Sequence, residues 1–314
     1  RIFIAGHTGL VGNSVLRLLQ SKKFKKIITA DKSKLNLLNE NLVDKFFKKK
    51  RPDILIICAA RVGGILENKN NQLDFLLDNL KIQNNLLLCA KKYNIKRTIF
   101  LGSSCIYPKE SSTPIKEEYL MTGKLEKTNE SYSLSKIIGL KMSSILALDY
   151  KKDVIALMPT NLYGINDNFD IKSSHVIPGL ISKFLEAKDN SKKEVFVWGS
   201  GVALREFLFV DDLAEAIYLI LNTSKKKLVK ASKSEIPTFN VGSGEIISIK
   251  KLAYKIKNIT NFKGRIIFDK KSLDGTLRKD LNSKKIKSLK WKAKIKLDKG
   301  LRMVIKSRIN NAES

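Results

Sequence analysis

The chain has 314 residues, 43% hydrophobic side chains and a formal net charge of +30 at pH 7. It holds no run of about 18 apolar residues, so we expect no membrane span and no membrane partner. Its two histidines and three cysteines (Cys58, Cys89 and Cys105) are too few for a disulfide framework or a structural zinc site. They predict a reduced, cytoplasmic setting and no metal.

Strands and helices alternate in the first half of the chain. Apolar runs predict strands near 1–6, 26–30, 53–60, 97–101 and 154–158. A helical pattern begins near residue 10, and others lie near 39–50, 71–93 and 131–150. The run DILIICAA at 53–60 is continuous, which is typical of a buried parallel strand. This alternation predicts an α/β fold with a Rossmann-like, doubly wound parallel sheet.

Shorter, mixed segments follow residue 166. Strands are expected near 194–197, 207–210 and 265–268, and helices near 176–187, 213–222, 248–259 and the C-terminus. We therefore predict a dinucleotide-binding domain at 1–165 and a smaller α+β domain, mainly substrate-binding, at 166–314, with some segments returning to the first domain. Asp211 and Asp212 directly precede an expected helix, so they are interpreted as its N-cap rather than a metal site.

The positive charge comes mostly from lysines spread along the whole chain. Its two concentrations, 48–51 and 225–227, fall where helices are expected to end, and the helix dipole favours cations there. Nucleic-acid binding would favour basic residues clustered on one face. We therefore expect no nucleic-acid partner.

A glycine-rich turn follows the first strand and opens the first helix. It reads Gly6-His7-Thr8-Gly9-Leu10-Val11-Gly12, which is a GxxGxxG pattern. Gly6 permits a tight turn, Gly9 lets a pyrophosphate approach the backbone, and Gly12 lets helix and strand pack closely. The helix N-terminus favours the anion. The seven residues therefore predict a dinucleotide site.

The second strand ends in an acidic and a basic residue side by side. An acidic residue there binds the ribose hydroxyls of NAD, whereas a basic one accepts the phosphate of NADP. Asp31 and Lys32 leave both possibilities open.

Tyr132 and Lys136 form a YxxxK pair, which places them on one helix face. A nearby ammonium favours the phenolate, so we expect a lowered pKa that suits Tyr132 as a general acid or base. Ser103 follows the strand at 97–101, at the sheet edge where ligands bind. It can hydrogen-bond the carbonyl oxygen that the tyrosine protonates.

Together these motifs resemble the extended short-chain dehydrogenase/reductases that modify nucleotide sugars. Arg205-Glu206-Phe207 and Asn240-Val241-Gly242 fall in the same order, and the resemblance spans almost the whole chain. Within that group the chain is similar to the GDP-L-fucose synthase family. Four stretches carry this similarity: ARVGGI at 60–65, GSSCIYP at 102–108, MPTNLYG at 158–164 and SHVIP at 174–178.

The resemblance implies a bifunctional enzyme, a 3,5-epimerase and NADPH-dependent 4-reductase that converts GDP-4-keto-6-deoxy-D-mannose to GDP-L-fucose. It implies Ser103, Tyr132 and Lys136 as the reductase triad. Cys105 and His175 correspond to the acid/base pair that moves protons at C3 and C5. Such protons are acidic because they lie next to a carbonyl, and two faces of one ring need two groups. On the residues alone, Cys105 also fits a packing role and His175 a helix cap.

Cofactor and substrate contacts follow from the same resemblance, which implies NADP without excluding NAD. The implied cofactor residues are Gly6, His7, Thr8, Gly9, Leu10, Val11, Gly12, Asp31, Lys32, Leu101, Gly102, Ser103, Ser104, Lys136, Pro159, Thr160, Asn161, Leu162 and His175. The implied substrate residues are Lys183, Trp198, Arg205, Arg265 and Asp274. A homodimer through a four-helix interface is also implied, built from the helices near 71–93 and 131–150.

Some positions depart from the family pattern. Thr8 and the Asp31-Lys32 pair stand where other forms have arginines, which weakens the NADP preference but not the reaction class. One alternative is another sugar-nucleotide epimerase or reductase of the same family. A 4,6-dehydratase would usually carry an acidic pair where this chain has Ser104-Cys105. An alternative of a different class is a nucleic-acid-binding protein on a vestigial reductase fold, against which the joint retention of the catalytic residues argues.

Overall fold

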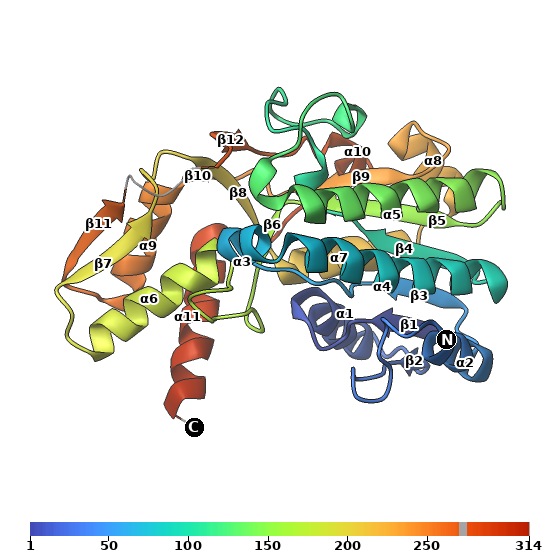
Figure 1. Cartoon of the computed structure of the whole chain (residues 1–314), viewed down its shortest axis with the longest axis horizontal. Coiled ribbons are helices and arrows are strands. Elements are labelled where there is room, and N and C mark those ends of the chain that lie inside the picture. Colours follow the sequence, from blue (N-terminus) through green and yellow to red (C-terminus); the bar gives the residue numbers. More distant parts are fainter. Residues whose placement is uncertain (270–274, 314) are drawn as a thin grey trace.

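The computed structural model describes residues 1–269 and 275–313. A large sheet flanked by helices occupies one part of the molecule, and a smaller group of strands and helices lies beside it (Figure 1). This arrangement confirms the predicted α/β, Rossmann-like fold.

Six parallel strands form the large sheet, in the order β2-β1-β3-β4-β5-β9. From β1 the chain crosses to β2 on one side and then to β3 on the other, so the topological switch point lies between β1 and β3. Open α/β sheets bind their ligands at the carboxyl end of such a point. The strands are β1 Ile2–Ala5, β2 Ile27–Ile28, β3 Ile54–Ile57, β4 Arg97–Leu101, β5 Val154–Pro159 and β9 Thr238–Val241.

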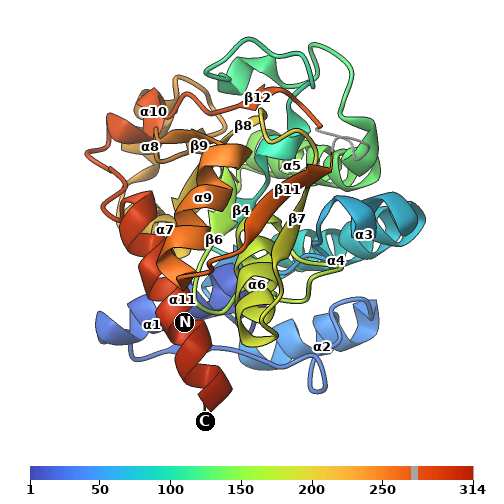
Figure 2. The same ribbon diagram turned by 90° about the vertical axis from the view of Figure 1, so that its left-hand side faces the viewer.

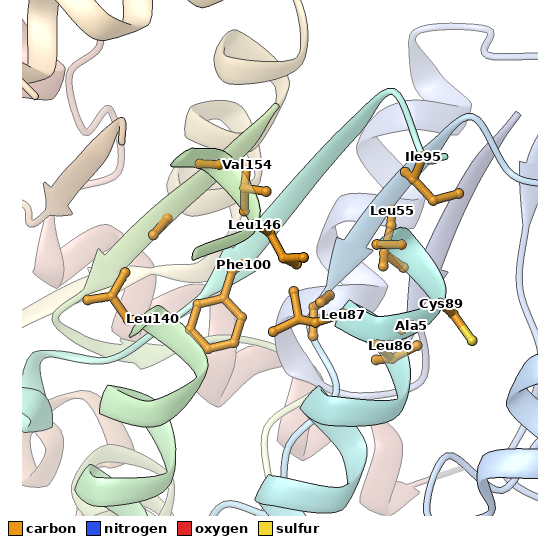
Figure 3. Close-up of a cluster of buried hydrophobic side chains, with 14 of the residues drawn as sticks. Ala5, Leu55, Leu86, Leu87, Cys89, Ile95, Phe100, Leu140, Leu146 and Val154 are labelled. Atoms are coloured by element: carbon orange, nitrogen blue, oxygen red, sulfur yellow. The ribbon is translucent and has the colours of Figure 1, made fainter. Parts of the chain in front are cut away.

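Helices cover both faces of this sheet, which is why its central strands are apolar throughout. One face carries α1 and α7, and the other carries α2, α4 and α5. Phe100 of β4 packs between Leu87 of α4 and Leu140 of α5 (Figure 3). Burying a side chain of this size stabilises the fold by roughly 1.5–3 kcal/mol. The helices are α1 Leu10–Ser21, α2 Glu40–Lys50, α4 Gln72–Lys92, α5 Glu130–Leu148 and α7 Val210–Leu221.

The smaller group has its own apolar core, shared by α6, α9, α11, β7 and β8. Figure 2 shows α6 and α9 against the parallel pair β7 and β11. A second small sheet has the order β10-β8-β12, with β6 also paired to β8. The elements are β6 Asn161–Tyr163, α6 Val176–Asp189, β7 Glu194–Trp198, β8 Leu204–Phe209, β10 Ile246–Ser248, α9 Ile249–Thr260, β11 Arg265–Asp269, β12 Arg278–Lys279 and α11 Leu297–Glu313.

The chain passes between the two groups several times. After β8 it returns to the large sheet as α7, and β9 then pairs with β5. The division at residue 165 stays a prediction, with α7 and β9 lying on the first group. Short elements complete the fold: α3 Ile65–Asn70, α8 Lys225–Ser232, α10 Lys284–Lys287 and the 3-10 turns η1 Ser104–Ile106, η2 Glu117–Tyr119 and η3 Lys127–Asn129.

Two local predictions were wrong. Asp211 and Asp212 lie in the first turn of α7, and the N-cap is Phe209. Asp212 accepts hydrogen bonds from the backbone N–H groups of Lys294 and Ile295, so its carboxylate fastens a distant loop rather than capping its own helix. The lysine cluster at 225–227 begins α8 instead of ending a helix.

No helix within residues 1–269 and 275–313 has the length and apolar character needed to cross a membrane.

Candidate active site

The glycine turn lies at the switch point, between β1 and α1. Gly6 has φ +85°, a conformation that residues with a Cβ rarely adopt. A Cβ on Gly12 would lie 2.1 Å from the Gly6 carbonyl oxygen, so the close approach of strand and helix requires glycine at position 12. Gly9 is the N-cap of α1 and makes no side-chain capping bond. The first turn of α1 thus keeps N–H groups free of a side-chain cap.

His7 and Asp31 meet beside this turn. The His7 Nε2 lies 3.2 Å from Asp31 Oδ1, and the buried Nδ1 of the same ring has no protein partner. Asp31 is therefore engaged with the glycine turn, and its neighbour Lys32 is exposed. An uncapped helix N-terminus, a glycine where a ligand would approach, and an unsatisfied ring nitrogen together fit a bound dinucleotide diphosphate.

Ser103 and Cys105 lie immediately beyond β4. The Ser103 Oγ accepts a hydrogen bond from the Cys105 backbone N–H at 3.1 Å, which caps the 3-10 turn η1. Tyr132 of α5 lies near both residues: its hydroxyl is hydrogen-bonded to the Ser103 side chain, and its phenol is within electrostatic range of the Cys105 thiol. The structure thus brings together the three predicted groups that would face a keto-sugar.

Lys136 is almost completely buried one turn further along α5, with 4% of its surface exposed. Its Nζ donates to the Leu101 carbonyl at the end of β4, 3.0 Å away. Burial lowers the pKa of Lys136 to about 8. The ammonium therefore anchors the helix to the strand that carries Ser103.

The predicted lowering of the Tyr132 pKa was wrong for this structure. Burial raises the pKa of the phenol above its usual value, the Cys105 thiol raises it further, and the hydrogen bond with Ser103 only partly opposes this. Helix spacing places Tyr132 one turn from Lys136, but burial of the phenol decides whether its pKa rises or falls. At neutral pH, Tyr132 carries its proton.

The other two cysteines lie in apolar surroundings, as predicted. Cys89 belongs to the core between α4 and the sheet (Figure 3), and burial raises its pKa to about 11. Burial also raises the pKa of Cys58, at the end of β3, to about 12. Neither thiol is suited to proton transfer near neutral pH.

His175 is the N-cap residue of α6, yet its side chain makes no capping bond. The side chain is open to solvent, and the protein around it still lowers the imidazole pKa by desolvation. The loop before it is held by the ARVGGI stretch: the Gly64 N–H donates to the Ser173 carbonyl at 2.8 Å. A Cβ on Gly64 would lie 2.4 Å from the Ser174 carbonyl oxygen, so this close backbone approach requires glycine.

Two predicted substrate residues lie together at one end of the pair β7 and β11. The Lys183 ammonium lies 4.3 Å from the centre of the Trp198 ring and donates to the Phe196 carbonyl. Burial lowers the pKa of Lys183. Arg205 lies on β8, and one of its Nη1 hydrogens is donated to the Leu204 carbonyl.

Arg265 is not brought to that end. It begins β11 opposite Glu194, to which it is paired at 2.7 Å, whereas Asp269 is the residue opposite Trp198. Four residues of strand separate the two positions, or roughly 13 Å at ~3.3 Å per residue. The predicted substrate residue Asp274 lies outside the described residues.

The PTNL stretch leaves the large sheet at the end of β5 and enters β6. The Thr160 Oγ1 and the Asn161 Nδ2 both donate to the Glu206 carbonyl, at 3.0 Å each. The Glu206 carboxylate is fully buried and accepts from the backbone N–H groups of Gly244 and Leu281. It joins segments on both sides of the site, and sequence reasoning missed it.

Asn129 is the second residue that was missed. Its Nδ2 donates to the Cys105 Sγ at 3.3 Å. An asparagine just before a helix usually indicates a cap, so the pattern gave no signal of a contact with a thiol 24 residues earlier.

A cavity of about 870 Å³ adjoins this region, lined by residues of the 108–128 excursion and Gly275. Among the described residues, its lining includes none of the five predicted catalytic side chains. Within residues 1–269 and 275–313, no group of three or more His, Cys, Asp or Glu side chains is placed to hold a metal ion.

Comparison with known proteins identifies this arrangement. Residues 2–242 match the NAD dependent epimerase/dehydratase family. The chain belongs to this family. The match covers every element of the large sheet together with the serine, tyrosine and lysine at its carboxyl edge. The resemblance inferred from the motifs is confirmed.

Relatives within the epimerase/dehydratase family match over nearly the full chain. GDP-L-fucose synthase 1 of Arabidopsis thaliana is 42% identical over 301 residues, covering 96% of this chain and 90% of that protein. GDP-L-fucose synthase of Escherichia coli (strain K12) is 39% identical over 301 residues, covering 96% and 94%.

Solved structures of the family superpose closely. A GDP-6-OMe-4-keto-L-xylo-heptose reductase from C. jejuni is 35% identical with a TM-score of 0.93, covering 99% of this chain and 97% of that one. A GDP-L-fucose synthetase from Naegleria fowleri bound to NADP is 26% identical with a TM-score of 0.85, covering 100% and 95%.

Proposed function

We propose that this chain is a bifunctional 3,5-epimerase and NADPH-dependent 4-reductase that converts GDP-4-keto-6-deoxy-D-mannose to GDP-L-fucose. One observation carries the proposal: at the carboxyl edge of the sheet, the Tyr132 hydroxyl is hydrogen-bonded to the Ser103 side chain and lies within electrostatic range of the Cys105 thiol. A proton-transfer group and a carbonyl-reducing pair thus share one site. The relatives named as GDP-L-fucose synthases support the same substrate.

The glycine turn, His7 and the Asp31-Lys32 pair would hold the dinucleotide. The uncapped start of α1 accepts its diphosphate, and the exposed ammonium of Lys32 is the group available for the phosphate that distinguishes NADP. Further contacts are assigned to Leu101, Gly102, Ser104, Lys136, His175 and the 159–162 stretch. When bound, NADPH supplies the hydride that reduces C4. The relative with NADP bound supports this cofactor.

Tyr132 acts as the acid of the reduction. Its raised pKa keeps the phenol protonated at neutral pH, so it can give a proton to the C4 oxygen. The Ser103 hydroxyl hydrogen-bonds the same oxygen and stabilises its developing negative charge. Lys136 holds the helix in place through the Leu101 carbonyl.

Cys105 and His175 move the protons at C3 and C5. At each carbon, one of the two groups removes the proton from one face to give an enolate, and the other group, in its protonated form, delivers a proton to the opposite face. The lowered pKa of His175 keeps its imidazole neutral at pH 7.

The nucleotide end of the substrate is assigned to the smaller group of elements. Arg205 suits the diphosphate because a guanidinium binds such oxygens bidentately, and Lys183 and Trp198 offer a charge and a flat ring side by side. Arg265 and Asp274 stay assigned by resemblance alone. The partner is thus a small molecule, and no nucleic acid is proposed.

A homodimer through α4 and α5 is part of the proposal. The two helices pack against each other and lie side by side on one face of the sheet (Figure 1). They leave apolar side chains exposed at helical spacing: Leu73, Leu77 and Leu88 on α4, and Leu134, Ile138 and Ile145 on α5. Light scattering at micromolar concentration should give twice the chain mass, and a monomeric mass would reject the dimer. The three free cysteines fit a reduced, cytoplasmic setting.

The test is a product analysis in heavy water. The protein is incubated with GDP-4-keto-6-deoxy-D-mannose and either NADPH or NADH, and the sugar is identified by NMR. GDP-L-fucose with deuterium at C3 and C5 is expected, formed faster with NADPH. A reduced but unepimerised sugar without deuterium would reject the epimerase and favour another reductase of the family.

A further inference from the structure

The thiol of Cys105 has a hydrogen-bond donor that none of the assigned catalytic residues supplies. The Asn129 side chain reaches across from η3 and donates its Nδ2 to the Cys105 Sγ at 3.3 Å. Both side chains are half-buried, so the contact lies at the wall of the site rather than on the outer surface. A donor so placed favours the charged form of its acceptor.

Asn129 makes this contact instead of the one expected at its position. It is the N-cap of α5, and asparagine is preferred there because its side-chain oxygen accepts an N–H of the first turn. In this helix the side chain makes no capping bond. By contrast, Asn39 caps α2 in the ordinary way, accepting from the Leu42 N–H at 3.0 Å. The Asn129 side chain therefore contacts the thiol instead of capping the helix.

Ser133 fixes the orientation of the amide. Its Oγ donates to the Asn129 backbone carbonyl at 3.0 Å and lies 3.4 Å from the Asn129 Oδ1. The Asn129 Oδ1 lies on the Ser133 side of the amide, which leaves the NH₂ group facing the sulfur. The Ser133 side chain is itself fully buried, so this support is rigid.

We propose that Asn129 is a positioning residue that holds the Cys105 sulfur and stabilises its thiolate during epimerisation. It acts through the thiol and does not itself exchange a proton. Because α5 also carries Tyr132 and Lys136, one helix start sets the thiol relative to the reductase pair. The inference rests on the proposed function for its catalytic meaning, but the effect on the thiol exists without substrate.

The phenol of Tyr132 on α5 also interacts electrostatically with this thiol. A phenol that stays protonated at neutral pH carries no charge against the thiolate. The effect of Asn129 should therefore persist in a Tyr132→Phe background, which separates the two neighbours.

The experiment measures alkylation of Cys105 by iodoacetamide against pH, without substrate, with each cysteine followed by peptide mass spectrometry. The variants are Asn129→Ala and Asn129→Asp, and Asn39→Ala is the matched control because it removes a true N-cap far from the thiol. Loss of one hydrogen bond to a charged group should raise the pH of half-maximal alkylation by ~1 unit in Asn129→Ala. Asn129→Asp should move it further, because a carboxylate replaces the donor. Asn39→Ala should lower the melting temperature and leave the profile unchanged.

The order of the two variants separates positioning from structure. Aspartate is nearly isosteric with asparagine and caps a helix equally well, so a purely structural role predicts that Asn129→Asp resembles the parent. An Asn129→Asp profile that matches the parent, or an unchanged profile in both variants, would overturn the proposal. Ser133→Ala serves if neither variant folds, and it should shift the profile in the same direction by less; no shift would again overturn it. A separate experiment tests the proposed function. If Cys105→Ser keeps its deuterium uptake while the alkylation profiles of the Asn129 variants shift as expected, the proposed function fails and the effect of Asn129 on the thiol is still supported.

Discussion

The contact between the ARVGGI stretch and the His175 loop can be tested with one methyl group. In Gly64→Ala the new Cβ would lie 2.4 Å from the Ser174 carbonyl oxygen, where ordinary contact begins at 3.4 Å, so the loop must yield by about 1 Å. Gly64 has φ −67° and ψ −178°, which alanine adopts freely, so the backbone itself is not strained.

The magnitude follows from that displacement. Overpacking of this kind costs ~1–3 kcal/mol of stability, and the lower entropy of the unfolded chain returns ~0.4–1 kcal/mol. The larger effect is functional, because a shift of ~1 Å in a reacting group can cost ~100-fold in rate. Proton exchange that depends on His175 should therefore fall by ~100-fold, while reduction by Tyr132 is largely retained.

The assay compares deuterium uptake at C3 and C5 with NADPH oxidation for the same protein. Gly63→Ala is the matched control, since its Cβ would meet side-chain atoms of Glu67 and Phe75 rather than a backbone carbonyl. The control should keep most of the exchange. Uptake in Gly64→Ala within threefold of the parent, in a folded protein, would refute the argument that this glycine sets the His175 loop.

Three further outcomes are expected. Tyr132→Phe should bind NADPH as the parent does and lose reduction at least 100-fold, because the ring packs alike but has no proton to give; single-turnover fluorescence checks both, and retained reduction would exclude Tyr132 as the acid. Cys105→Ser should accumulate the unepimerised reduced sugar, because an alcohol is far harder to deprotonate than a thiol; full deuterium uptake at both carbons would return Cys105 to a packing role. Burial raises the pKa of Asp167 to about 7, so its folded form prefers the neutral acid and stability is lost as pH rises from 3.8 to about 7. Asp167→Asn should therefore stabilise the fold by up to ~4 kcal/mol at pH 8 and hardly at all at pH 4; an equal gain in urea titrations at both pH values would contradict this.

The large sheet could be predicted because its strands are short apolar runs separated by helical patterns. β9 was not predicted as a strand, since its four residues carry no periodicity of their own and gain their place from pairing with β5. Likewise α8 begins with three lysines, and nothing in a charged run distinguishes the start of a helix from its end without the preceding turn.

The site was predictable in its parts but not in its contacts. Spacing placed Tyr132 one turn from Lys136, yet it could not show that burial would outweigh the ammonium and raise the phenol pKa. The bond from Asn129 to Cys105 spans an excursion of irregular chain, whose path no local pattern encodes. Arg265 followed from resemblance, and only the register of β11 against β7 separates it from Trp198.

The repeated passage of the chain between its two groups of elements has a consequence for how the enzyme can be cut or assembled. A fragment ending after β5 would leave that strand as an unpaired edge and would uncover the apolar face that α7 protects. We therefore expect that neither half folds to a stable domain before the other is present. Because several segments of the chain connect the two groups, we expect any opening of the site to be a small relative rotation rather than a wide hinge motion.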